Sequence, residues 1–289
     1  MSEKKETFGG EFAKKLPIDK IYEDAAQPLA QSVGTTLSIP IDAINAALSN
    51  VRKWINEREY TIKAQEILND KLLEYLKGVP SERIVTPDRF IVLPLLRDIN
   101  YVCDNEVIYE KYASLLATNM DSDTKNLAHP SFIQIIEQLS PLDAKLIDSA
   151  GYLIESQPLI RIFSSNEPLI QDKRMTDLNM PEFGNAEKKY PLFSHYSYSI
   201  DGLNTTATER NLVIQNLNRL GLINIDYREH IIDATQYRPL YQSLLGSSFY
   251  LDFVKDTEQK GRYLGLTDGY TSPTDFGRLF YSVCCKAIL

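Results

Sequence analysis

The residues best suited to chemistry in this chain of 289 residues lie in one short stretch, where Asp121 and Asp123 are followed by Thr124. This stretch superficially resembles the D-x-D-x-T motif of phosphatases in which an aspartate attacks phosphate and paired carboxylates hold a magnesium ion, although Thr124 here directly follows Asp123. In those enzymes the loop follows a buried strand, whereas the apolar residues before Asp121 repeat with helical spacing. We therefore interpret Asp121 and Asp123 as residues that cap a helix and shape the turn after it.

The remaining candidates for catalysis or metal binding are scattered along the chain. The three histidines, His129, His195 and His230, lack the paired spacing of zinc sites such as H-E-x-x-H. His129 directly precedes Pro130, so we assign it to local hydrogen bonding or capping at a helix start. The sequence also lacks a phosphate-binding glycine loop and a G-x-S-x-G nucleophile elbow. We expect no catalytic residues, no metal site and no cofactor, and hence a protein that is not an enzyme.

Composition indicates a folded protein of the reducing cytoplasm. Hydrophobic residues make up 43% and charged residues 24%, as in ordinary globular proteins, and the net charge is −8. The cysteines are odd in number and two of them, Cys284 and Cys285, are adjacent, so no disulfide framework is predicted. The N-terminus lacks the apolar segment of a secretory signal, and no stretch approaches the roughly 20 apolar residues of a spanning helix. The acidic charge opposes attraction to nucleic acid and to anionic lipid.

Helical periodicity dominates the first half of the chain. Residues 1–16 are polar and lack any period, which predicts a flexible tail, and residues 17–140 are predicted to form a helical domain. Within this domain Ala26, Ala30 and Gly34 recur at four-residue spacing, giving one helix face small enough for close contact with another helix. This face predicts a homo-oligomer or a protein partner, with packing inside the chain as the alternative.

Prolines and capping residues mark the helices in the middle of the chain. Residues 86–88, Thr-Pro-Asp, predict an N-cap at Thr86 and a helix that begins with the proline. Pro130 is predicted to begin another helix. Ser140 precedes Pro141, and Asp143 follows three residues later, so that this stretch is a capping box for a helix to about residue 156.

Short strand-like segments, among them residues 262–266, alternate with helices over residues 141–289. Insertions are predicted at about 164–193, as a loop, and at about 237–256, as helix. The order of helix, strand, strand and helix is typical of a winged helix, but its central helix carries only Arg210 and Arg219, too few cations for DNA affinity. The predicted fold class is mainly α, with an N-terminal helical region followed by a winged-helix-like α+β unit.

A family resemblance rests on residues 115–124, 128–132 and 138–144, which contain Asp121, Asp123, His129, Pro130 and Ser140. Shorter matching segments, among them residues 77–80 and 84–87, extend it over roughly residues 25–286. These segments resemble the Abi-alpha family, bacterial proteins associated with abortive infection, in which an infected cell stops growing before phage progeny emerge. The resemblance implies anti-phage defence and brings no established catalytic residues. We expect a non-enzymatic binding or effector protein; the alternatives are a membrane-inserting toxic effector acting through its N-terminal helices and a winged-helix transcriptional regulator.

Overall fold

The computed structural model describes residues 68, 70–77, 79–99, 102, 105–149, 151–197, 204–227 and 238–285. The chain divides into two compact units, one comprising residues 1–138 and 282–289 and the other residues 139–281. The predicted tail over residues 1–16 and the predicted contact face of Ala26, Ala30 and Gly34 lie outside the described residues.

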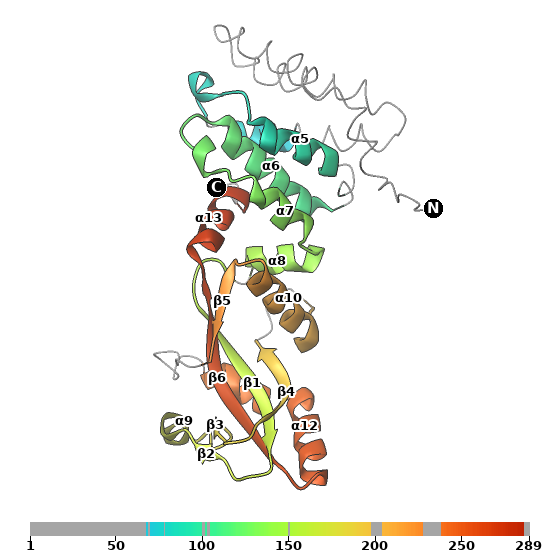
Figure 1. Ribbon diagram of the computed structural model, residues 1–289, viewed down its shortest axis with the longest axis vertical. Helices are drawn as coiled ribbons and strands as arrows, with labels where there is room; N and C mark the ends of the chain where they lie inside the picture. The colour runs from blue at the N-terminus through green and yellow to red at the C-terminus, as the bar shows by residue number, and fades with distance from the viewer. Residues whose placement is uncertain are drawn as a thin grey trace, which may run out of the picture. The chain divides into compact units, whose positions relative to one another are not determined.

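Helix α6 (Glu106–Met120) is the centre of the first unit. It packs against α5 (Arg89–Asp98) and α7 (Ser131–Glu137), which also pack against each other (Figure 1). Twelve of its 15 residues are buried, as expected for a helix surrounded by other elements. The last residues of α13 (Asp275–Cys284) complete this unit, and the Ser114 hydroxyl donates a 2.7 Å hydrogen bond to the carbonyl oxygen of Val283.

Capping side chains determine where the helices of this unit begin. The Asn105 side chain accepts a hydrogen bond from the backbone N–H of Ile108 and caps α6. Helix α5 begins two residues later than predicted, because the carboxylate of Asp88, and not Thr86, accepts from the backbone N–H of Phe90 at 2.8 Å. The backbone N–H of Asp88 in turn donates to the side chain of Asn119, which ties the start of α5 to the end of α6.

A curled antiparallel sheet of four strands, in the order β4-β1-β6-β5, organises the second unit (Figure 1). The strands are β1 (Gln157–Ser165), β4 (Tyr190–Tyr196), β5 (Ile223–Asp226) and β6 (Tyr263–Pro273). Strands β1 and β6 pair over the full length of β1, from Gln157 opposite Thr271 to Ser165 opposite Tyr263. A separate two-stranded sheet pairs β2 (Ile170–Gln171) with β3 (Gly184–Asn185).

The mainly α fold class predicted from the periodicity is wrong, because this four-stranded sheet makes the fold α+β. Strand β4 lies mostly in residues predicted as a loop, and β6, predicted only over residues 262–266, continues to Pro273. The winged-helix outline is not confirmed. Strands β5 and β6 do not form an isolated wing, since β6 pairs along most of its length with β1, and β4 extends the sheet beyond β1.

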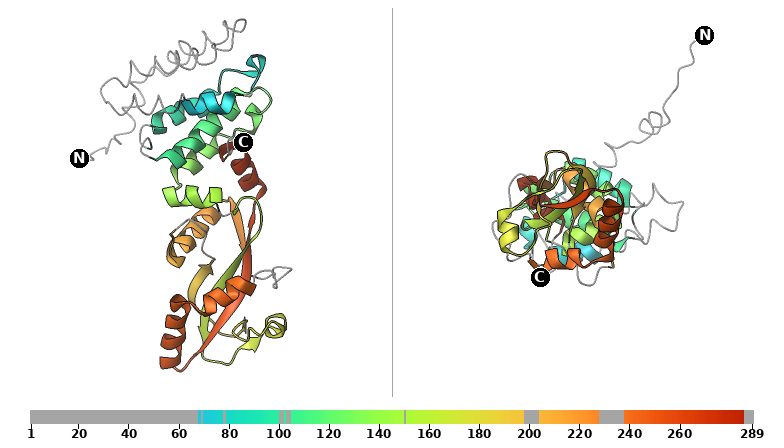
Figure 2. Two further views of the ribbon diagram at one scale, coloured as in Figure 1. Left: turned by 180° about the vertical axis from the view of Figure 1, so that it is seen from behind. Right: turned by 90° about the horizontal axis from the view of Figure 1, so that it is seen from below.

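One face of the sheet packs against helices. Residues Ile160, Ile162 and Leu266 meet side chains of α11 (Arg238–Leu245) and α12 (Ser248–Gln259), together with Met175 of α9 (Lys173–Asp177), in an apolar cluster. In the view from behind, the orange helices lie against the sheet (Figure 2). Helices α8 (Pro141–Ser149) and α10 (Ala207–Arg219) pack against each other at the other end of the unit.

Candidate functional site

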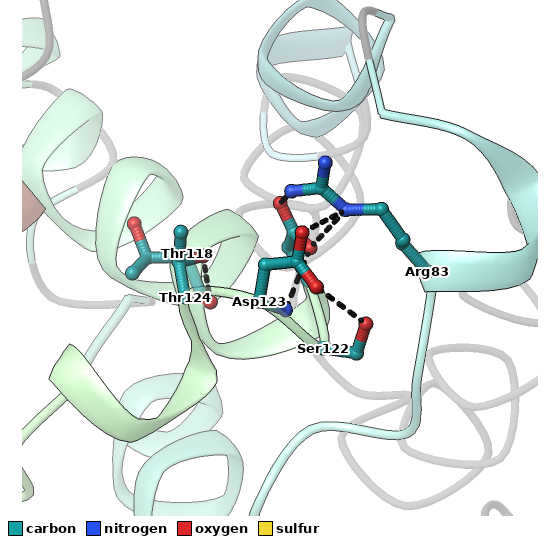
Figure 3. Close-up of polar contacts among 6 residues, drawn as sticks. Arg83, Thr118, Ser122, Asp123 and Thr124 are labelled. Atoms are coloured by element: carbon teal, nitrogen blue, oxygen red, sulfur yellow. Dashed lines mark hydrogen bonds and ion pairs between the residues drawn. The ribbon is translucent and has the colours of Figure 1, made fainter.

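The turn that follows α6, which contains the predicted aspartates, is held by the segment that precedes α5. The backbone N–H of Val85 donates to the carbonyl oxygen of Met120 at 2.8 Å, and that of Ser122 donates to the carbonyl oxygen of Arg83 at the same distance. These two bonds form an isolated antiparallel β-bridge with Asp121 at its centre. The bridge brings the Arg83 side chain beside the turn (Figure 3).

Arg83 binds both predicted aspartates. Its Nη2 donates to Asp121 Oδ2 at 2.6 Å and its Nε donates to Asp121 Oδ1 at 3.0 Å, while the same Nε lies 3.0 Å from Asp123 Oδ2. The first two bonds form the bidentate guanidinium–carboxylate pair that combines charge with two hydrogen bonds. Hydrogen bonding to Asp121 raises the pKa of the Arg83 guanidinium. The side chain of Asp121 is only 8% exposed, so its carboxylate is enclosed and already bound to a cation.

The turn is also stabilised by its own side chains. Asp121 Oδ1 accepts from the backbone N–H of Asp123 at 3.0 Å, and the Thr124 hydroxyl donates to the carbonyl oxygen of Thr118 at 2.9 Å (Figure 3). The Ser122 hydroxyl lies 3.4 Å from Asp123 Oδ1. Each polar side chain in this stretch therefore contributes to the geometry of the turn.

The structure places His129 and Pro130 at the start of α7. His129 Nδ1 accepts from the backbone N–H of Ser131 at 3.2 Å and lies 2.6 Å from the Ser131 hydroxyl. Its ring lies 6.0 Å from that of Phe132, between centroids. Pro130 is the N-cap residue of α7 and has no side chain able to cap it. The His129 ring caps the helix instead, by accepting from the backbone N–H of Ser131, the first residue of α7.

Ser140 belongs to the second unit, where it opens α8. Its hydroxyl accepts from the backbone N–H of Asp143 at 3.1 Å, and Asp143 Oδ2 accepts from the backbone N–H of Ser140 at 2.7 Å. This is the reciprocal pattern of a capping box, with aspartate in place of the more usual glutamate. The same Asp143 oxygen accepts from the Asn216 side chain at 2.9 Å, which joins α8 to α10.

Arg83 and Asn216 are the two residues of these sites that sequence reasoning missed. Both act across long separations: Arg83 lies 38 residues from Asp121, and Asn216 lies 73 residues from Asp143. A weak signal for Arg83 is present, because it directly precedes residues 84–87, one of the segments that carry the family resemblance.

The described parts of the chain contain no group of three or more His, Cys, Asp or Glu side chains arranged to hold a metal ion. None of the helices described is both long enough and apolar enough to cross a bilayer. The candidate functional site is thus the turn after α6, in which Arg83 binds Asp121 and Asp123.

The fold and this turn define a class of protein with two units. A helical unit, in which an arginine–aspartate ion pair holds the turn after the central helix, is followed by an α+β unit with a four-stranded antiparallel sheet. Residues 56–284 match the family model described as Abortive infection alpha. The chain therefore belongs to the abortive infection alpha family, and the resemblance noted in residues 115–144 is confirmed. Neither the curated proteins nor the solved structures gave a match.

Proposed function

We propose that this protein acts in bacterial defence against phage by abortive infection, as a binding or effector protein without catalysis of its own. Family membership supports the defence role. The bidentate pair between Arg83 and Asp121 supports the non-enzymatic role. Asp121 lies in the stretch that most resembles a catalytic motif, yet both of its carboxylate oxygens already bind a cation.

A reacting aspartate needs an accessible oxygen that can approach phosphate or a metal ion. Asp121 Oδ1 accepts from Arg83 Nε and from the backbone N–H of Asp123, and Asp121 Oδ2 accepts from Arg83 Nη2. Removing Arg83 from this enclosed carboxylate would leave a charge without its partner. The role that fits these contacts is to position the turn between α6 and α7.

The proposed partner is another protein or a second copy of the chain, which would contact the face of Ala26, Ala30 and Gly34. Small side chains at four-residue spacing support close helix contact. Light scattering on the natural protein and on Gly34→Leu should show an oligomer that the variant disrupts. A monomer at high protein concentration would contradict self-association.

The defence role can be tested by expressing the chain in bacteria, challenging them with a panel of phages, and recording plaque formation, host growth and membrane potential. We expect protection with the membrane potential intact. Protection with depolarisation would instead support membrane insertion. A lack of protection, together with derepression of a specific promoter on deletion, would support a transcriptional regulator.

The non-enzymatic role is tested by Asp121→Asn, with Asp123→Asn as the control because the Asp123 side chain is 60% exposed. We expect Asp121→Asn to lower the melting temperature more than the control and to lose protection only to the extent that the protein unfolds. An Asp121→Asn protein that melts like the natural one but loses both protection and a phosphatase or nuclease activity would show that the protein is an enzyme.

A further inference from the structure

Arg161 and Lys189 gather on the face of the sheet opposite to α11 and α12. Residues Ile160 and Ile162 point into the apolar cluster with those helices, so Arg161, which lies between them in β1, points to the other face. Thr267 in β6 lies directly opposite Arg161. Lys189 Nζ lies 3.4 Å from the hydroxyl oxygen of this same Thr267. The two cationic groups therefore flank one residue of the sheet.

Aromatic rings hold both cations without neutralising them. The guanidinium carbon of Arg161 lies 3.9 Å from the ring centroid of Tyr227, and Lys189 Nζ lies 4.7 Å from that of Phe163. A cation over an aromatic face is attracted by the ring quadrupole but keeps its full charge and its N–H donors. These contacts orient the two head groups and leave their donors available to an anion.

Tyr227 provides a fixed support for Arg161. Its hydroxyl donates a 2.7 Å hydrogen bond to the carbonyl oxygen of Ser194 in β4, and its ring lies over Gly269 in β6. The ring of His195 stacks on that of Tyr227, with 5.9 Å between centroids and an angle of 23° between the planes. Tyr227 thus spans from β6 to β4 beside Arg161, and burial raises its pKa, so it stays neutral.

The cations lack an acidic partner in the described parts of the chain, where neither Arg161 nor Lys189 forms an ion pair. Partial burial of the ammonium group lowers the pKa of Lys189, and the positive charge of Arg161 lowers it further. Two adjacent cations without a counter-charge repel each other, and binding an anion would relieve that repulsion. Because the net charge of the chain is −8, this pair is a local feature and not part of a generally basic surface.

We infer that Arg161 and Lys189 bind the phosphate group of a small phosphorylated ligand on this face of the sheet. The planar guanidinium of Arg161, lying over Tyr227, can present two parallel N–H donors to phosphate oxygens. The Lys189 ammonium adds a compact charge, and the Thr267 hydroxyl beside it can donate a further hydrogen bond. Two cations suit one phosphate group, whereas a nucleic acid would need several phosphate contacts. The inference goes beyond the defence role and does not depend on it.

The test is isothermal titration calorimetry of the full-length protein at low ionic strength, with inorganic phosphate, adenosine monophosphate and a single-stranded DNA oligonucleotide as separate probes. We expect phosphate or the nucleotide to bind. Each of Arg161→Gln and Lys189→Gln should weaken that binding about tenfold, the effect of losing one charge-assisted contact. Lys188→Gln, which changes the exposed neighbouring lysine, is the matched control and should leave affinity nearly unchanged.

Melting curves accompany each titration, and Lys189→Gln carries the test if Arg161→Gln fails to fold, because Lys189 is exposed and precedes β4. The inference is overturned if neither phosphate nor the nucleotide binds at millimolar concentration, or if folded Lys189→Gln binds as tightly as the natural protein. It is also overturned if the oligonucleotide binds far more tightly than the nucleotide with the same dependence on Lys189, since the ligand would then be a nucleic acid.

Discussion

Replacing Gly269 with alanine would place a methyl group where the structure has no room for it. A Cβ built on Gly269 lies 2.4 Å from Cδ1 of Tyr227 and 2.5 Å from the carbonyl oxygen of Asp226. The second contact is to backbone, and Asp226 is held in β5 by its pairing with Tyr270 of β6. Rotation of the Tyr227 ring alone therefore cannot relieve the overlap, and β5 must shift as well.

The size of the effect on the free energy of unfolding follows from two destabilising contributions and one that offsets them. Overpacking a filled site costs about 1–3 kcal/mol, and displacing Tyr227 also weakens its hydrogen bond to Ser194, a loss of about 1 kcal/mol. The lower backbone entropy of alanine in the unfolded chain offsets about 0.4–1 kcal/mol of this. We expect Gly269→Ala to lower the free energy of unfolding by about 1–3 kcal/mol. Phosphate binding should weaken too, because Tyr227 supports Arg161.

Urea denaturation followed by circular dichroism measures the change, with Gly246→Ala as the matched control. The nearest atom to a Cβ built on Gly246 is the carbonyl oxygen of Gln242 at 3.6 Å, an ordinary contact. This control should leave stability unchanged or raise it by up to about 1 kcal/mol. If Gly269→Ala were as stable as Gly246→Ala, the reasoning that Tyr227 and β5 pack tightly against β6 would be refuted.

Two further predictions concern single side chains. Burial, with the nearby charge of Arg161, lowers the pKa of His195 from 6.5 to about 4, so the neutral ring contributes stability that is complete above pH 6.5 and lost as the pH falls toward 4. At about 1.4 kcal/mol per pKa unit this lowering corresponds to at most roughly 3.5 kcal/mol, and screening by solvent around the partly exposed ring makes the loss smaller. Unfolding curves of His195→Asn should lack this part of the pH dependence, and identical curves for both proteins would contradict the prediction. Ser140→Ala should destabilise the protein by about 1 kcal/mol, because the backbone N–H of Asp143 loses the Ser140 hydroxyl as its acceptor. The control Ser149→Ala, at the end of α8, should have little effect. Equal melting temperatures for the natural protein and both variants would count against the capping box.

The helix starts at residues 105, 130 and 140 could be predicted from the sequence because their signals are local. Asn105 and Ser140 bind backbone donors only three residues away. The sheet was harder to predict. Strand β4 contains Pro191 and pairs irregularly with β1, and Gly265 and Gly269 interrupt the apolar pattern of β6. The two glycines accommodate neighbouring aromatic rings, and the sequence therefore indicated only the first part of β6.

The candidate sites show the same division between local and distant partners. The sequence indicated that Asp121 and Asp123 shape a turn, because the residues Asp, Ser, Asp and Thr in succession after a helical pattern suit a helix end. It could not indicate Arg83 as their partner, since nothing in the spacing connects positions 38 residues apart. Arg161 and Lys189 come together only through the pairing of β1 with β4 and β6.

The order of strands in the sheet has a consequence for how the protein is made on the ribosome. Strand β6 lies between β1 and β5, yet it is the last strand to be synthesised. The first unit also needs late residues of the chain, because the carbonyl oxygen of Val283 accepts a hydrogen bond from the Ser114 hydroxyl. Neither unit can be completed until the residues of β6 and α13 have emerged. A translation product that stops before α13 would therefore leave β1 and β4 as an unfinished sheet and α6 without its last contacts, a fragment suited to degradation by proteases.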